Sequence, residues 1–260
     1  MACVLTFTRP VWQPDPSVDD RRLFLNRCAD ACGRLGHQNR AYLADHAERL
    51  YATWRLCRRL VPPGRSMLSI GAGSAFVENA LAADGAEVTV VDFPEAIELN
   101  ASHYRASGLS AVAADASDPA ALARLGEFDA VLAAEIVEHV PVAPSELFRG
   151  WSACVRGGGG LVVSTPNLGS VSSLLRLLFM RPLLPPAEQV FGPVSFENEG
   201  VHRREYMPSE IRSAFTSAGL RPEIVAFSLN HRPRGIKEAL YVPLQLVPRF
   251  RPTMIATAAK

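Results

Sequence analysis

Two carboxylates and an imidazole are spaced for joint chemistry in the segment Ala134-Glu135-Ile-Val-Glu138-His139. In a helical turn, Glu135, Glu138 and His139 at i, i+3 and i+4 would share one face and converge on one point. Neighbouring carboxylates repel each other unless a proton or a cation lies between them. Oxygen and imidazole ligands together suit a divalent cation. The segment predicts a metal site or, without a metal, a histidine that acts as general base or bonds to the backbone.

A second group of residues is arranged to hold a nucleoside. Gly71 and Gly73 lie between an expected strand and an expected helix, where glycine permits a tight turn and a close approach of the backbone to a ligand. Asp92 ends the next strand and can accept both ribose hydroxyls, and Asp115 ends the third strand within reach of an adenine amino group. A dinucleotide site would require a third glycine where Phe76 stands.

These residues need a scaffold of alternating strands and helices. Short apolar runs predict strands at Ser66–Ile70, Glu87–Val91, Ser110–Ala114, Phe128–Ala133, Gly160–Ser164, Pro222–Asn230 and Met254–Ala259. Helical patterns lie at 76–84, 94–106, 118–125, 143–155 and Pro208–Ala218, after two N-terminal helices, from a cap at Ser17 through Ala31 and from Gln38 to Leu60. The order predicts an α/β fold with a mostly parallel sheet covered by helices on both faces.

The succession of segments resembles class I S-adenosylmethionine-dependent methyltransferases over roughly residues 60–260. The glycine turn is similar to their motif I, Phe128-Asp-Ala-Val-Leu to motif IV, and Arg156–Asn167 to the following loop and strand. This resemblance implies a Rossmann-like, doubly wound, seven-stranded sheet with an antiparallel last strand.

The same resemblance assigns the cofactor contacts. It implies that Asp92 holds the ribose, Phe93 packs near the adenine, Asp115 reads the adenine edge, and the two glycines admit the methionine part. We expect three further residues to line this site, Ser69, Ala116 and Glu135. The chain departs from the family at two positions: Ser69 stands where an acidic residue is usual, and Ala75 where a third glycine is usual.

A later fragment, His202-Arg-Arg-Glu205-Tyr206, sharpens the metal hypothesis. Together with the earlier cluster, it resembles the metal site of Hen-type small-RNA 2′-O-methyltransferases, and the cluster alone resembles ubiquinone-pathway O-methyltransferases. The resemblance implies Glu135, Glu138, His139 and His202 as catalytic residues and ligands of Mg, Mn, Fe or Zn. Glu205 and Tyr206 are expected to orient the loop, and the remaining histidines to be packing or surface residues: His37, His46, His103 and His231.

The function expected from these residues is metal-assisted O-methylation of a vicinal diol or catechol-like group on a small, lipophilic or sugar-containing acceptor. Three alternatives stay open: metal-free N-, C- or O-methylation with His139 as base, RNA 2′-O-methylation, and a non-methylating cofactor-binding protein. The balance of 27 basic against 26 acidic residues argues against nucleic acid as a partner.

The chain is expected to consist of a helical extension over 1–60 and a methyltransferase domain over 61–260, with a lid at about 168–200. No apolar stretch is long enough to span a membrane, and five cysteines without paired or metal-type spacing indicate a cytoplasmic protein. The apolar runs Val171–Leu184 and Leu240–Phe250 suggest a lipophilic acceptor or peripheral membrane contact, although both also fit buried helices. Nothing in the sequence indicates an oligomeric state.

Overall fold

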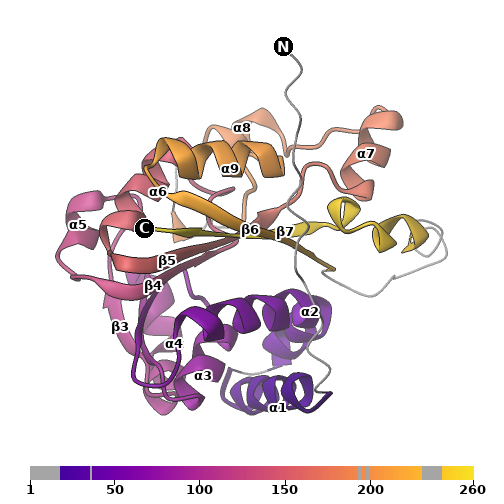
Figure 1. Cartoon of the computed structure of the whole chain (residues 1–260). Coiled ribbons are helices and arrows are strands. Elements are labelled where there is room, and N and C mark those ends of the chain that lie inside the picture. The colour runs from indigo at the N-terminus through magenta and orange to yellow at the C-terminus, as the bar shows by residue number, and fades with distance from the viewer. Residues whose placement is uncertain (1–17, 36, 193–194, 197–199, 230–241) are drawn as a thin grey trace.

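The computed structural model describes residues 18–35, 37–192, 195–196, 200–229 and 242–260 (Figure 1). The expected cap Ser17, together with Cys3, Leu240 and His231, lies outside them. The elements in chain order are α1 (Val18–Leu35), α2 (His37–Leu60), β1 (Ser66–Ile70), α3 (Phe76–Ala83), β2 (Glu87–Asp92), α4 (Pro94–Ala106), β3 (Ser110–Ala113), α5 (Pro119–Ala123), β4 (Phe128–Ala134), α6 (Pro144–Ala153), β5 (Val155–Pro166), α7 (Val171–Leu178), α8 (Ala187–Val190), α9 (Pro208–Ser217), β6 (Arg221–Ser228), the 3-10 helices η2 (Val242–Leu246) and η3 (Pro248–Phe250), and β7 (Thr253–Ala259).

The sheet has seven strands in the order β3-β2-β1-β4-β5-β7-β6. Neighbours from β3 to β5 are parallel, whereas β7 runs antiparallel to both β5 and β6. The predicted Rossmann-like sheet with an antiparallel last strand is therefore confirmed. The chain order reverses between β1 and β4, and ligands of such sheets bind beyond the carboxyl ends of the strands at this switch point.

β5 is the strand that differs most from its prediction. It was expected over Gly160–Ser164 after a helix reaching residue 155, but it begins at Val155, and α6 ends at Ala153. Gly160, the last residue of the glycine run, pairs with Ala130 of β4 and with Ala259 of β7, and the register with β4 shifts between Phe128 and Ala130. A Cβ on Gly159 would lie 2.4 Å from the carbonyl oxygen of Asp129, so the strands approach closely only because this residue is glycine.

Two apolar layers cover the two faces of the sheet. Alternate residues of each strand point to opposite faces, so Met67 packs with α1, α2 and α3, and Leu68 packs with α5, α6 and α9. Figure 1 shows the sheet nearly edge-on between these two groups of helices. The four described cysteines are buried and unpaired, as expected of packing residues.

The N-terminal helices are fastened to the end of α3 through one carboxylate. Asp84 accepts a hydrogen bond from the Trp54 indole of α2 at 3.0 Å and from Arg27 of α1 at 2.7 Å. The fully buried rings of Phe24 and Trp54 pack together beside it, with centroids 5.3 Å apart. These contacts fix the position of α2 along the sheet.

The segment between β5 and α9 begins with α7 and α8, and its leucines do not form the buried helix that the sequence also allowed. Leu174, Leu177 and Leu178 of α7 are exposed, as are Phe179 and Met180 after it. Within the described residues, no helix has the length and hydropathy to cross a membrane.

Replacing Asp84 with alanine tests the attachment of the N-terminal helices. Two charge-assisted hydrogen bonds are lost and the Trp54 indole is left without its acceptor, so we expect the free energy of unfolding to fall by about 3 kcal/mol. Urea denaturation measures the change. The control Asp30→Ala alters an exposed carboxylate of α1 and should change stability by about 0.5 kcal/mol or less. Equal losses in the two variants would contradict the anchoring role.

Candidate active site

The glycine turn after β1 has the backbone conformation that its sequence requires. Gly71 and Gly73 have φ of 66° and 50°, in the left-handed region. A Cβ on Gly71 would lie 2.1 Å from the Ile136 side chain, so both conformation and space call for glycine. Ala75, which stands where the family has a third glycine, also has a left-handed φ of 49° and is the N-cap residue of α3. The chain thus keeps the turn despite the steric cost of a side chain there.

Asp92 is held at the end of β2 by backbone amides. The N–H of Gly73 donates to Oδ2 at 3.0 Å, and the N–H of Phe93 donates to Oδ1 at 2.8 Å. Burial raises the pKa of Asp92, whereas the two amides act in the opposite direction. The carboxylate is therefore fixed beside the glycine turn, where a nucleoside would meet it.

Asp115 and Ala116 are fixed in the turn after β3. Ser117 donates to Asp115 Oδ1 through its backbone N–H at 2.8 Å and its hydroxyl at 2.7 Å. The indole of Trp151 donates to the carbonyl of Ala116 at 2.9 Å, which ties this turn to α6.

A cavity of about 530 Å³ lies beyond the carboxyl ends of the strands, within the range of sites for small ligands. Most of the residues assigned to the site from the sequence line it: Gly71, Gly73, Asp92, Phe93, Asp115, Ala116, Glu135, His139 and His202. The described part of the expected lid, apart from Gly200, does not line it. The lid role stays a prediction.

Ser69 does not line the cavity but lies buried behind it. Its hydroxyl donates to Oε1 of Glu78 at 2.5 Å, and Glu78, from the first turn of α3, lines the cavity. Burial raises the pKa of Glu78. The acidic group that the family carries on β1 thus has a counterpart on the neighbouring helix.

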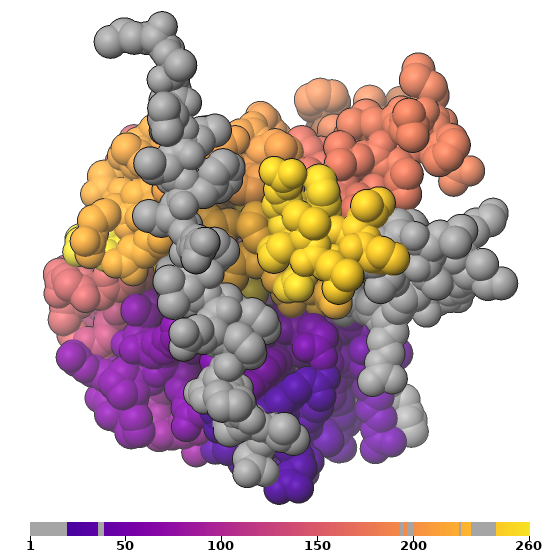
Figure 2. Space-filling view, turned by 45° about the vertical axis from the view of Figure 1, so that its right-hand side comes forward, coloured from indigo at the N-terminus to yellow at the C-terminus, as the bar shows by residue number. Residues whose placement is uncertain are grey.

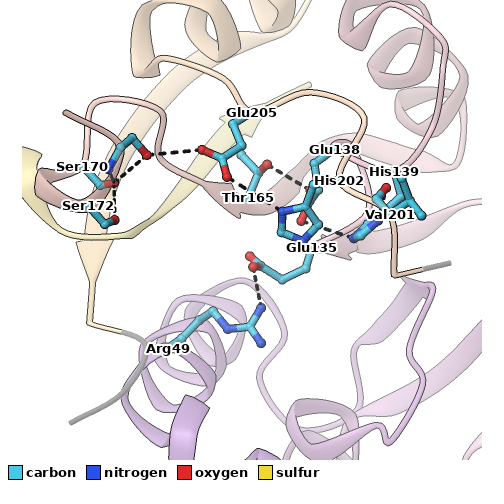
Figure 3. A network of polar contacts seen from close by, with 11 residues as sticks. Arg49, Glu135, Glu138, His139, Thr165, Ser170, Ser172, Val201, His202 and Glu205 are labelled. Atoms are coloured by element: carbon cyan, nitrogen blue, oxygen red, sulfur yellow. Dashed lines mark hydrogen bonds and ion pairs between the residues drawn. The ribbon is translucent and has the colours of Figure 1, made fainter. Parts of the chain in front are cut away.

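The segment after β4 corrects the expectation of a helical turn. Residues 137–139 form a turn rather than a helix, and Glu135 has a left-handed φ of 58°. Its carboxylate therefore points away from the other two side chains, toward α2, where Oε2 pairs with Arg49 at 2.8 Å (Figure 3). The hydroxyl of Ser164 donates to the other oxygen at 2.8 Å. Glu135 does not join the group that is close enough to share one ion.

That group consists of Glu138, His139 and His202, with one donor atom from each lying within 4.8 Å of the others. Figure 3 shows the two imidazoles beside Glu138, and their rings lie 4.8 Å apart. Oε2 of the fully buried Glu138 accepts from Thr165 at 2.9 Å, whereas Oε1 has no hydrogen-bond partner within the described part of the chain. Burial raises the pKa of Glu138, and the nearby Glu135 adds to the rise.

The tautomer of His139 follows from its backbone contact. Nδ1 lies 3.0 Å from the carbonyl oxygen of Val201, which can only accept, so this nitrogen carries the proton. Nε2 is then unprotonated and offers its lone pair to a proton or a cation. It lies 3.6 Å from Oε1 of Glu138. Burial lowers the pKa of His139, and His202 lowers it further, so the neutral ring is favoured.

Residues of α2 were missed as part of the site. Tyr42, His46 and Arg49 line the cavity, although His46 was expected to be an ordinary packing or surface residue. Arg49 donates to the hydroxyl of Tyr42 at 2.7 Å, and the rings of Tyr42 and His46 lie 4.4 Å apart. The spacing i, i+4 and i+7 was the available signal, because it places these three side chains on one helical face.

Comparisons with known proteins identify the family of the chain. Residues 35–224 match a family model described as a methyltransferase domain. The ubiquinone biosynthesis O-methyltransferase of Xanthomonas axonopodis pv. citri (strain 306) is 28% identical over 174 residues, covering 65% of this chain and 67% of that protein. Its counterpart in Bordetella avium (strain 197N) is 30% identical over 166 residues, covering 61% and 63%. The matches thus span about two thirds of these relatives.

Solved structures share the fold at low sequence identity. The magnesium protoporphyrin IX methyltransferase of Synechocystis PCC 6803 with bound SAH has a TM-score of 0.56 at 16% identity, covering 92% of this chain and 97% of that one. An S-adenosylmethionine-dependent methyltransferase of Mesorhizobium loti has a TM-score of 0.52 at 20% identity, covering 80% and 98%. With the family model covering most of the sequence, this chain belongs to the methyltransferase domain family and is an S-adenosylmethionine-dependent methyltransferase.

Proposed function

We propose that the protein methylates a hydroxyl oxygen of a small acceptor that carries two neighbouring hydroxyls, with the help of a divalent metal ion. The observation that carries this proposal is the buried Oε1 of Glu138, which faces the imidazole of His139 and has no hydrogen-bond partner among the residues that the structure describes. A buried carboxylate is costly unless it is protonated or paired with a cation. The names of the curated relatives support oxygen as the methylated atom.

The three side chains fit a metal ion. A metal-ligating histidine commonly donates its second ring N–H to a carbonyl, as His139 does to Val201. Glu138, His139 and His202 would hold the ion, and a set of two imidazoles and one carboxylate suits Mn, Fe or Zn better than Mg. A bound divalent ion would supply charge that lowers the pKa of an acceptor hydroxyl.

The protein's own residues position the cofactor and the acceptor for methyl transfer. In the reaction the S–CH₃ bond breaks as the C–O bond forms, the hydroxyl gives up its proton to solvent water, and S-adenosylhomocysteine leaves. Asp92 and Asp115, at the ends of β2 and β3, would hold the nucleoside, and the acceptor would meet the methyl group near His139, which follows β4 on the other side of β1. Alignment of acceptor and methyl in this cavity provides much of the rate enhancement.

A second candidate is metal-free transfer with His139 as general base. The unprotonated Nε2 of His139, fixed by the contact between Nδ1 and Val201, favours it, because this nitrogen can accept the acceptor's proton. The acceptor would then be an unspecified nucleophile.

The acceptor is proposed to be lipophilic and to reach the protein from a membrane surface. Exposed apolar side chains lie on α7 and the two residues after it, and on η2 and the residue after it: Leu174, Leu177, Leu178, Phe179, Met180, Leu244, Leu246 and Val247. Asn167, just before α7, donates to the carbonyls of Arg249 and Arg251, so the two segments are adjoining, and Figure 2 shows them on one face.

The charges of these segments fit an anionic surface. Residues 171–184 and 242–251 include arginines but no acidic residue. Apolar side chains with a basic fringe are typical of segments that lie on anionic lipid. The free, buried cysteines suit the reducing cytoplasm, where we place the protein.

Metal removal separates the two candidate mechanisms. If a metal ion activates the acceptor, exhaustive chelation and His202→Ala should each lower turnover by at least about 100-fold, since both remove the ion. Affinity for S-adenosylhomocysteine, measured by calorimetry, should persist because its expected contacts lie on other strand ends. The control Arg204→Ala alters an exposed side chain of the same segment, which pairs with Glu210, and should retain turnover. Full turnover after chelation, with no metal found by elemental analysis, would favour His139 as a metal-free base.

The membrane contact is tested with vesicles. Sedimentation with phosphatidylcholine vesicles containing phosphatidylglycerol should carry the protein down, and Leu178→Glu should reduce the bound fraction several-fold because it places a charge in the apolar interface. Leu99→Glu is a matched control, since Leu99 on α4 and Leu178 are both 72% exposed. Equal binding by the two variants, or no dependence on the anionic lipid, would rule out this surface.

A further inference from the structure

Arg203 is a buried arginine whose N–H groups contact the turn that carries Glu138 and His139. Its guanidinium Nε donates to the carbonyl oxygen of His139 at 2.8 Å, and its backbone N–H donates to the carbonyl oxygen of Glu138 at 2.7 Å. Two residues earlier in the same segment, the carbonyl of Val201 accepts the hydrogen bond from Nδ1 of His139 (Figure 3). The segment 201–203 therefore holds His139 both by its main chain and by its ring.

The two carbonyls that Arg203 contacts determine where the imidazole points. They belong to the peptide groups on either side of the His139 Cα, and each peptide group is planar and moves as a unit. Holding both peptide groups therefore fixes the direction in which the side chain leaves the main chain. Residues 137–139 themselves form a turn, in which the N–H of His139 donates to the carbonyl of Ile136 at 2.9 Å. The contacts from Arg203 add support from a distant part of the chain.

The guanidinium of Arg203 also reaches α8. Its Nη1 donates to the carbonyl oxygen of Val190, the last residue of that helix. α8 is a single turn of helix without a buried residue, and helices this short depend on contacts with the rest of the protein. Phe191, which follows α8, is 87% exposed. Arg203 thus ties a weakly packed part of the expected lid to the turn of His139.

We infer that Arg203 is a positioning residue for His139 and that it couples the direction of this imidazole to the position of α8. The inference rests on the proposed role of His139 as metal ligand or general base, and it does not depend on which of the two is correct. Both roles use Nε2 in the cavity that His139 lines, because Nδ1 is bonded to Val201. A guanidinium suits this task because its N–H donors lie in one plane and point in fixed directions, whereas a lysine ammonium is a point charge on a flexible stem.

Proton NMR of the full chain tests the positioning without an acceptor. The Nδ1 proton of His139 should give a slowly exchanging signal, which is assigned by its absence in His139→Gln. Arg203→Met should speed the exchange of this proton with water by about 10-fold or more, because hydrogen bonds to a charged donor are lost from the turn. Arg203→Lys keeps the charge without the planar fork and should fall between the native protein and Arg203→Met. The control Arg204→Met alters an exposed neighbour and should leave the exchange near that of the native protein.

Amide hydrogen exchange tests the coupling to α8 in the same variants. Arg203→Met should speed exchange at Val190 and Phe191 several-fold, whereas Arg204→Met should not. Affinity for S-adenosylhomocysteine, measured by calorimetry, should stay near the native value in both variants, because Arg203 does not line the cavity, and this result also shows that they are folded.

Three results would overturn the inference: native exchange of the His139 Nδ1 proton in Arg203→Met, native exchange in α8, or a loss of S-adenosylhomocysteine affinity that marks a general effect on the fold. The proposed function is tested separately, by comparing methylation of catechol by the native protein and by His139→Gln. Equal rates there would contradict the role of His139 in the reaction, whatever the exchange measurements show.

Discussion

The ion pair between Arg49 and Glu135 is the contact on which the arrangement of the site depends. It joins α2 to the turn after β4 through two residues that both line the cavity, and it requires α2 to stay where Trp54 and Asp84 hold it. It also draws the carboxylate of Glu135 toward the helices and away from Glu138. Figure 3 shows Glu135 between Arg49 of α2 and the group formed by Glu138, His139 and His202.

The parts of this protein that were predictable from its sequence are those encoded by local patterns. Asp92 and Asp115 could be placed because each directly follows an apolar run, and the carboxyl ends of parallel strands meet at one edge. Gly71 and Gly73 predict a tight turn by residue type alone, because glycine readily adopts the positive φ that both residues have. The seven-stranded sheet follows from the same repetition of short apolar runs and helices.

The remaining features depend on contacts between distant residues, which no local pattern specifies. Glu135 and Glu138 looked like partners on one helical face, but the left-handed φ at Glu135 sends the first carboxylate toward α2. Ser69 stands where the family usually has an acidic residue. Only the structure shows that its hydroxyl donates a hydrogen bond to Glu78 of α3. His202 was placed near His139 only through a family resemblance, since the two are brought together by the contact between Nδ1 of His139 and the backbone of Val201.

The position of β7 has a consequence for how the protein is made. Of the strands that the structure describes, β7 is synthesised after β5 and β6, yet it lies between them. Until it emerges, β5 has an open edge beside Ser164 and Thr165, the residues that hold Glu135 and Glu138, and β6 lacks its strand partner. Open strand edges can pair with other chains. The nascent chain therefore completes its nucleoside side early and its imidazole side late, and during that interval it is most exposed to aggregation.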